Sequence, residues 1–380
     1  GQPDRYGGGK RRHLLAKALA VLAVPRLSSR DSLCARERRR GHVARRAPRI
    51  APRRRRGSAR NLAHSVARRR RRSGSERERM TAARALRVAA LLAASTARAT
   101  IEWRDVSASI KSRSILRDIS GRATPGRLHA IMGPSGCGKS SLLSALSGTC
   151  DRTLSLSGDL RVDGAPVDRV DAAFVRQQDV FYPYLTVRET LTFAATLRLG
   201  AAAAVDDVVD DLLTKTGLAK AADTIVGDDK IRGISGGERK RLAIACELVD
   251  DPDVLFLDEP TSGLDSFAAQ RVVSSLRALC DAGKTVVCVI HQPSGAVFNA
   301  FDDLTLLSEG ELMFQGPVHG LDAHLAASGK PRPRFAARAE HAVEAVSVNY
   351  ETELQEAASR GVLAKLAAAT AKKRASAPAP

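Results

Sequence analysis

Aromatic side chains and long apolar runs are both scarce in this chain. Phe, Trp and Tyr make up 4% of the 380 residues, with a single tryptophan. No stretch reaches the roughly 18 consecutive apolar residues of a membrane-spanning helix. The best candidates, residues 14–24 and 88–94, are short, and Lys17 interrupts the first. The sequence as given therefore predicts no membrane-spanning helix.

Cysteine pairs at metal-binding or redox spacing are also missing. No CxxC pair occurs, and no histidine lies at metal-ligand spacing from a cysteine. We interpret the cysteines as reduced thiols of a cytosolic chain and not as a disulfide or zinc framework. They are Cys34, Cys137, Cys150, Cys246, Cys280 and Cys288.

Acidic residues are rare over residues 1–98, which contain 29 Lys or Arg and only 5 Asp or Glu. The net charge of +20 thus belongs to this segment, whose Arg clusters and lack of apolar mass predict disorder. Three interpretations stay open: a solvated extension upstream of Met80, an organelle transit peptide, or an Arg-rich anchor for nucleic acid. The last is disfavoured because no aromatics interleave the arginines. Residues 80–99 also outline a secretory signal with a very short apolar core.

A glycine-rich loop at 133–141, GPSGCGKSS, follows the apolar run 128–132 and precedes a helix-like segment. A strand, a loop of this pattern and a helix start predict a phosphate-binding loop. Its backbone N–H groups would cradle phosphates, Lys139 would reach the β and γ phosphates, and Ser140 would ligate Mg²⁺.

Other segments predict a parallel sheet with an antiparallel layer beside it. The apolar runs 254–258 and 285–290 have the continuous pattern of strands buried on both faces, and 172–176 reads as a third strand. Segments 101–106, 115–119 and 158–164 predict small antiparallel strands, the last ending in an Asp-Gly turn signal.

Helical periodicity marks residues 190–218 and 266–279. A further helix is expected after Ser235, which has Glu238 three residues on, as in a capping box. The two glycines between them leave bare N–H groups suited to a second anion contact. Asp258, Glu259 and His291 end apolar strands, where open α/β sheets bind ligands.

These segments together resemble the ATP-binding cassette family, most closely its subfamily G half-transporters. The resemblance covers about residues 100–320 and runs through the motifs in the family's order. They are the phosphate loop at 133–141, Gln177 with 185–195, the signature ISGGERKR at 234–241, LDEPTSGLDS at 257–266 and IHQPS at 290–294. The fold implied is an α/β P-loop NTPase of RecA-like type, with a parallel core sheet, an antiparallel β subdomain and a helical signature subdomain.

The resemblance divides the chain into a basic extension over 1–98, a nucleotide-binding domain over 99–320 and a remainder over 321–380. The domain would contain a helical insert at about 180–248. The remainder would be a partial connecting region with a disordered tail. Residues 338–347 match the subfamily segment expected after the cassette only weakly. The transmembrane half that the resemblance implies is not in the sequence as given.

The resemblance also implies roles for individual residues. Glu259 would be the general base, with Lys139, Gln177 and His291 as further catalytic residues. The implied Mg²⁺ ligands are Ser140, Gln177 and Asp258. The implied ATP contacts are Gly133, Pro134, Ser135, Gly136, Cys137, Gly138, Lys139, Ser140 and Ser141, with Ser235, Gly236, Gly237 and Asp265 contributing from a second cassette. The aromatic residue that often stacks on adenine is not evident, since Ser107-Ala-Ser109 occupies its region.

The implied activity is ATP hydrolysis that powers export of a lipid, sterol or other amphipathic compound. The implied partners are a second cassette and a transmembrane domain, which would hold the protein at the cytoplasmic face of the plasma membrane or an organelle membrane. Two alternatives stay open: a soluble cassette ATPase that acts on RNA or ribosomes through the Arg-rich segment, and a non-hydrolysing regulatory cassette.

Overall fold

The structure is a computed structural model, and it divides into two units, 1–78 and 79–380. All predictions for residues 1–98 lie outside the described residues. The residues that the structure describes are 99–150, 153–167, 170, 172–200, 205–348 and 350–376.

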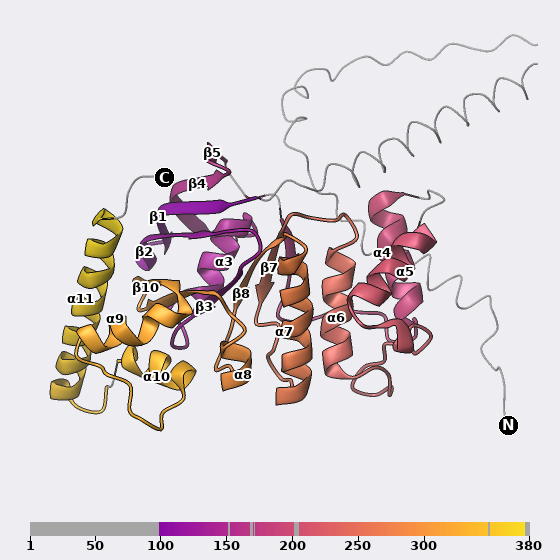
Figure 1. Cartoon of the computed structure of the whole chain (residues 1–380). Helices are drawn as coiled ribbons and strands as arrows, with labels where there is room; N and C mark the ends of the chain where they lie inside the picture. Colours follow the sequence, from indigo (N-terminus) through magenta and orange to yellow (C-terminus); the bar gives the residue numbers. More distant parts are fainter. Residues whose placement is uncertain are drawn as a thin grey trace, which may run out of the picture. The chain divides into compact units, whose positions relative to one another are not determined.

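A six-stranded sheet forms the centre of the described unit (Figure 1). Its strand order is β10-β9-β3-β8-β7-β6, and all neighbours are parallel except β9 and β10, which form an antiparallel hairpin. The parallel core is confirmed, whereas the hairpin at its edge was not predicted. The strands are β3 (Leu128–Met132), β6 (Ala173–Val175), β7 (Val254–Asp258), β8 (Thr285–Val289), β9 (Asp303–Ser308) and β10 (Glu311–Pro317).

Both faces of the central sheet are buried. In β7, Leu255 and Leu257 belong to one apolar cluster, while Val254 and Phe256 belong to a second cluster on the opposite face. Side chains alternate across a strand, so a continuous apolar run fits a strand that is covered on both sides. The continuous runs in the sequence were therefore a correct signal for this sheet.

An antiparallel sheet covers one side, in the order β2-β1-β4-β5. Asp163 and Gly164 link β4 to β5 with φ values of 51° and 79°, and the positive φ at both positions confirms the predicted type I′ turn. Helix α3 packs against both sheets. These elements are β1 (Ile101–Ile110), β2 (Arg113–Ala123), β4 (Leu154–Val162), β5 (Ala165–Pro166) and α3 (Lys139–Ser147).

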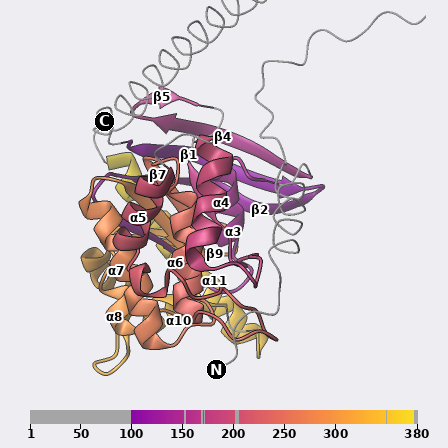
Figure 2. The same cartoon turned by 90° about the vertical axis from the view of Figure 1, so that its right-hand side faces the viewer.

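Helices cover the other face, and α4 and α5 lie at the end opposite α11 (Figures 1 and 2). The helical pattern predicted over 190–218 forms two helices, because Gly200 ends α4 with a φ of 79°. The helices are α4 (Val187–Leu199), α5 (Val205–Lys215), α6 (Gly236–Glu247), α7 (Ser266–Asp281) and α8 (Gly295–Phe298), with a 3-10 turn, η1 (Ala219–Ala221).

The region after the cassette corrects one prediction. We expected a disordered tail, but α11 (Glu353–Ser376) is a long helix that packs on β10. Its alanines favour a helix, Leu363 and Leu366 are buried, and the Thr370 hydroxyl donates to the Met313 carbonyl at 2.7 Å. Before it come η2 (Val318–Gly320), α9 (Leu321–Ala327) and α10 (Arg338–Ala345).

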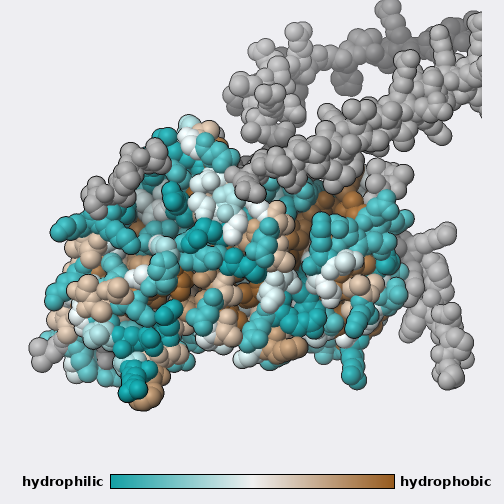
Figure 3. Space-filling model, in the orientation of Figure 1, coloured by the Kyte–Doolittle hydropathy of each residue, from teal (hydrophilic) through white to brown (hydrophobic). Residues whose placement is uncertain are grey.

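Hydrophilic residues predominate on the face shown in Figure 3, with apolar surface in smaller stretches between them. Among the described residues, no helix has both the length and the apolar character that crossing a bilayer requires.

Candidate functional site: a phosphate loop at the carboxyl edge of the sheet

Four motif segments leave the central sheet at one edge. Strand pairing aligns Val175, Leu257, Cys288 and Ala130 in a single row across β6, β7, β8 and β3. The chain reaches a predicted site residue within three positions of each. These residues are Gln177, Asp258 with Glu259, His291 and Gly133. The register therefore brings together residues that are up to 158 positions apart in the sequence.

The loop between β3 and α3 has the curvature that phosphate binding requires. Gly138 has a φ of 100°, and a β-carbon there would lie 2.7 Å from Cδ2 of Leu116. At Gly133 a β-carbon would collide with the Leu307 carbonyl. Only glycine fits these two positions, because a side chain would be both strained and crowded.

The first turn of α3 places its free N–H groups and two side chains at the loop. The buried Lys139 ammonium lies against the loop and donates to the carbonyls of Gly133 at 3.1 Å and Pro134 at 2.8 Å. The helix terminus and this ammonium together create a strongly positive region suited to phosphate.

Ser140 and Asp258 lie in contact across the site. The Ser140 hydroxyl donates to Oδ1 of Asp258 at 3.0 Å. Burial raises the pKa of the Asp258 carboxyl, the Ser140 bond opposes that shift, and the nearby Glu259 charge adds to it. The result is a hydroxyl and a carboxylate placed as a pair of oxygen ligands for a hard cation.

Glu259 occupies an unusual backbone conformation directly after β7. Its φ is 46°, and its N–H donates to the Val289 carbonyl at 3.1 Å. Its Oε2 accepts a hydrogen bond from Nε2 of Gln177 at 2.8 Å. A non-glycine residue in the left-handed region is uncommon, and such strain often marks functional sites.

His291 lies two residues beyond β8 and is exposed at the same edge. The next residue, Gln292, has a φ of 43°, so the chain turns sharply here, as it does at Glu259. The structure thus places His291 at the edge where it was expected, while its contact with the γ-phosphate stays a prediction.

The signature segment starts α6, and the predicted capping box is confirmed. The Ser235 hydroxyl accepts from the Glu238 N–H at 3.3 Å, and Oε2 of Glu238 accepts from the Ser235 N–H at 2.9 Å. Gly236 and Gly237 begin the helix. Arg241, one turn later, is buried, and its Nε and one terminal nitrogen have no hydrogen-bond partner among the described residues. Its charge adds to the positive field of the helix start.

Asp265 has a local structural role. Its Oδ1 caps α7 by accepting from the N–H groups of Phe267 and Ala268, both at 2.9 Å. This capping role needs no second chain. The contact of Asp265 with a second cassette stays a prediction.

Sequence analysis missed two charged residues beside the site. Lys240 and Asp179 form a buried ion pair at 2.9 Å, with side chains only 6% and 9% exposed. The signal was present, because Lys240 lies three residues after the buried Gly237 and four before the buried Ile244, on the inner face of α6.

A hollow of about 1100 Å³ adjoins the phosphate loop. Residues 134–137 line one side, and Ile110 and Tyr350 also contribute. The Tyr350 hydroxyl donates to Glu309 at 2.7 Å, and Arg360 binds the other oxygen of that carboxylate at 2.7 Å. The segment after the cassette thus supplies an aromatic ring next to the loop.

Comparison with known proteins gives a consistent answer. The sequence model of the family described as ABC transporter matches residues 116–262. ABC transporter G family member 7 of Arabidopsis thaliana is 50% identical over 232 residues, which are 58% of this chain and 32% of that protein. The broad substrate specificity ATP-binding cassette transporter ABCG2 of Rattus norvegicus is 45% identical over 223 residues, 57% of this chain and 34% of that protein.

ABC transporter G family member 13 of Arabidopsis thaliana is 41% identical over 262 residues, 66% of this chain and 39% of that protein. The chain therefore spans about a third of the length of these relatives. With the phosphate loop, the signature helix and the strand-end carboxylates in their places, residues 116–262 form an ATP-binding cassette of the ABC transporter family, and the chain is similar to members of its subfamily G.

Proposed function

We propose that this chain binds ATP with Mg²⁺, hydrolyses it between two cassettes, and thereby drives export of a lipid, sterol or other amphipathic compound across a membrane. The observation that carries the proposal is that the site residues meet at the carboxyl ends of the parallel strands. Lys139, the Ser140–Asp258 pair and the Gln177–Glu259 pair all lie there.

The chain's own groups would bind the triphosphate from one side. Backbone N–H groups of 136–141 would donate to the phosphate oxygens, and the Lys139 ammonium would exchange its present carbonyl acceptors for the β and γ phosphates. His291 would approach the γ-phosphate from the neighbouring strand end. This arrangement neutralises charge that develops on the transferred group.

The residues present fit a magnesium ion. Ser140 and Asp258 offer oxygen atoms 3.0 Å apart beside the phosphate loop, and Gln177 offers an amide oxygen nearby. Mg²⁺ prefers such oxygen ligands together with phosphate oxygens and water. When bound, the ion would polarise the γ-phosphate and offset its charge.

Glu259 would act as the general base. Its carboxylate would take the proton of a water directed at the γ-phosphate, and Gln177 holds that carboxylate through the 2.8 Å hydrogen bond. The backbone of Glu259 is held by Val289, which fixes where the side chain starts. The fixed position of this carboxylate would therefore contribute to catalysis.

Two cassettes would be needed for one complete site. A chain with one phosphate loop and one signature helix can hold ATP with the first and offer the second to a partner. Ser235, Gly236 and Gly237 would donate to the γ-phosphate bound by the other cassette, aided by the field of buried Arg241. The second copy would be this chain or a related one.

The nucleoside would lie in the hollow beside the loop. Ile110 offers an apolar surface that is 38% exposed, and Tyr350 offers a ring that is 63% exposed. Aromatic stacking is tolerant of base identity and contributes about 1–3 kcal/mol. This placement would compensate for the missing aromatic residue near Ser107–Ser109.

Transport and location follow from the relatives, which are named as transporters. The export path would be formed by a transmembrane domain, and this chain would work at the cytoplasmic face of the membrane. Substrate choice would belong to that domain.

The test is substitution of the base. We expect Glu259→Gln to keep ATP affinity within a few-fold and to lower turnover by at least ~10²-fold, because the general base is removed. Nucleotide binding and phosphate release by the full chain would be measured in parallel, with Lys215→Met on exposed α5 as a control. Hydrolysis at the wild-type rate would contradict the assigned role.

A further inference from the structure

Lys240 connects the signature helix to the segment that carries Gln177. It lies in α6, which Figure 1 labels, five residues after Ser235, and its side chain contacts the chain that follows β6. Its Nζ donates to the carbonyl of Arg176 at 3.2 Å, to the carbonyl of Gln177 at 3.0 Å and to Oδ1 of Asp179 at 2.9 Å. An ammonium has three protons, so its donor capacity is fully used.

These hydrogen bonds are largely shielded from solvent. The side chains of Lys240 and Asp179 are 6% and 9% exposed. Burial raises the pKa of the Asp179 carboxyl, and the hydrogen bond from Lys240 opposes this shift. A buried ammonium that loses its partners is strongly penalised, so α6 and the chain at 176–179 are expected to move together.

The same segment ends at the proposed base. The Gln177 carbonyl is held by Lys240, while the Gln177 amide donates to Oε2 of Glu259 at 2.8 Å. A continuous series of bonds thus runs from α6 through Lys240 and Gln177 to Glu259. The helix that would contact a partner's ATP is tied to the carboxylate that would act on the chain's own ATP.

We infer that Lys240 is a positioning residue, an inference that rests on the proposed function. Lys240 couples the position of the signature helix to the positions of Gln177 and Glu259. Closure of α6 on a partner's nucleotide displaces Lys240, and Lys240 displaces the Gln177 backbone with it. Hydrolysis at one site therefore responds to occupation of the other.

The test uses variants that keep the chain folded. Lys240→Met alone leaves the Asp179 carboxylate buried and unpaired, so the main variant is Lys240→Met combined with Asp179→Asn. We expect kcat for ATP to fall at least tenfold, with Kd for ATP within threefold of wild type. Lys215→Met, which breaks the exposed Lys215–Asp211 pair, is the matched control and leaves kcat unchanged.

Gln177→Ala gives a measurement that distinguishes a positioning role from a merely structural one. Because Lys240 acts through Gln177, we expect that adding Lys240→Met and Asp179→Asn to Gln177→Ala lowers kcat little further than Gln177→Ala alone. Losses that multiply, or a wild-type kcat in the double variant, would overturn the inference while leaving the proposed function intact. A wild-type chain that binds no ATP would instead contradict the function, and the inference with it.

Amide hydrogen exchange gives an answer that does not depend on turnover. We expect residues 176–179 to exchange faster in the double variant than in wild type, and to be unchanged in Lys215→Met. Equal exchange in all three proteins would overturn the inference.

Discussion

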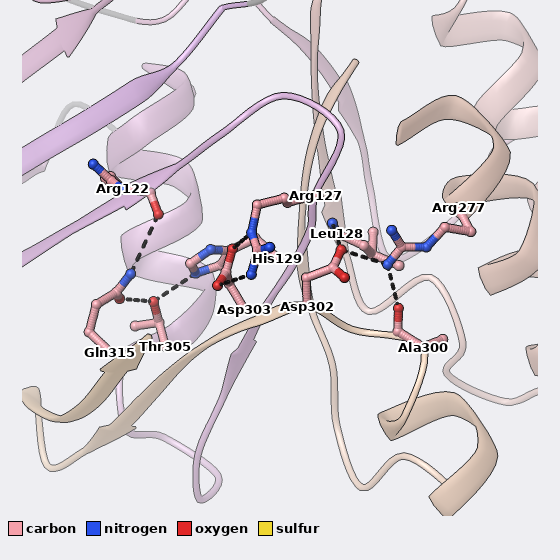
Figure 4. Close-up of polar contacts among 10 residues, drawn as sticks. All are labelled: Arg122, Arg127, Leu128, His129, Arg277, Ala300, Asp302, Asp303, Thr305 and Gln315. Carbon is pink, nitrogen blue, oxygen red and sulfur yellow. Dashed lines mark hydrogen bonds and ion pairs between the residues drawn. The ribbon is translucent and has the colours of Figure 1, made fainter. Parts of the chain in front are cut away.

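A buried histidine below the phosphate loop makes folding stability depend on pH. His129 in β3 is fully buried, its Nε2 lies 2.8 Å from Oγ1 of Thr305, and the Thr305 hydroxyl donates to Oε1 of Gln315 at 2.5 Å (Figure 4). Since that hydroxyl proton is already donated, His129 Nε2–H must be the donor to Thr305. Nδ1 then carries the lone pair, and it has no partner among the described residues.

Protonation of Nδ1 would therefore place a charge and an unpaired N–H in the core. Burial lowers the pKa of His129 from 6.5 to about 4. Between these values the unfolded chain binds more protons than the folded chain, so the free energy of unfolding falls as the pH falls. From pH 7.5 to pH 5 the loss through His129 is about 2 kcal/mol, and below the folded pKa it grows no further.

The assay is urea unfolding of the full chain at pH 7.5 and 5, compared with His129→Gln. Glutamine keeps an N–H donor near the Nε2 position but does not titrate. The single tryptophan, Trp103, is buried, and its ring lies edge-on to that of His129 with the ring centroids 5.8 Å apart. Its fluorescence therefore reports unfolding around His129. We expect the wild type to lose about 2 kcal/mol more than the variant. Equal losses in the two proteins would refute the reasoning.

Three further substitutions have definite expectations. Gly138→Ala should abolish ATP binding and destabilise the domain by roughly 1–3 kcal/mol, measured by nucleotide titration and urea unfolding, because its β-carbon would meet Leu116 at a φ of 100°. Tyr350→Ala should weaken ATP binding about tenfold by loss of stacking but leave inorganic triphosphate binding unchanged, as a competition assay would show. Ser235→Ala should cost about 1 kcal/mol in unfolding experiments through loss of the α6 cap. Unchanged values in any of these would contradict the contact concerned.

The sequence correctly predicted those elements whose signal lies within one short stretch of the chain. The run 254–258 is buried on both faces and is a strand with the predicted limits, because apolar continuity directly reflects a two-sided core. The Asp163-Gly164 turn and the Ser235 cap followed from short-range backbone chemistry.

Features that depend on distant contacts escaped prediction. The tail helix α11 is stabilised by Thr370 and Arg374, which bind Met313 and Asp105 far away in the sequence. The partner of Lys240 is 61 residues upstream, and no periodicity identifies it. Such pairs become visible only once the chain has folded, because tertiary context decides them.

The central claim is that ATP is held between two cassettes. Light scattering of the Glu259→Gln variant with and without ATP and Mg²⁺ tests it most directly, with Ser235→Arg added in a second variant to obstruct the signature helix start. We predict that Glu259→Gln doubles in mass only with ATP, and that the second variant binds ATP without doubling. A Glu259→Gln chain that is saturated with ATP yet keeps the mass of a monomer would contradict the account.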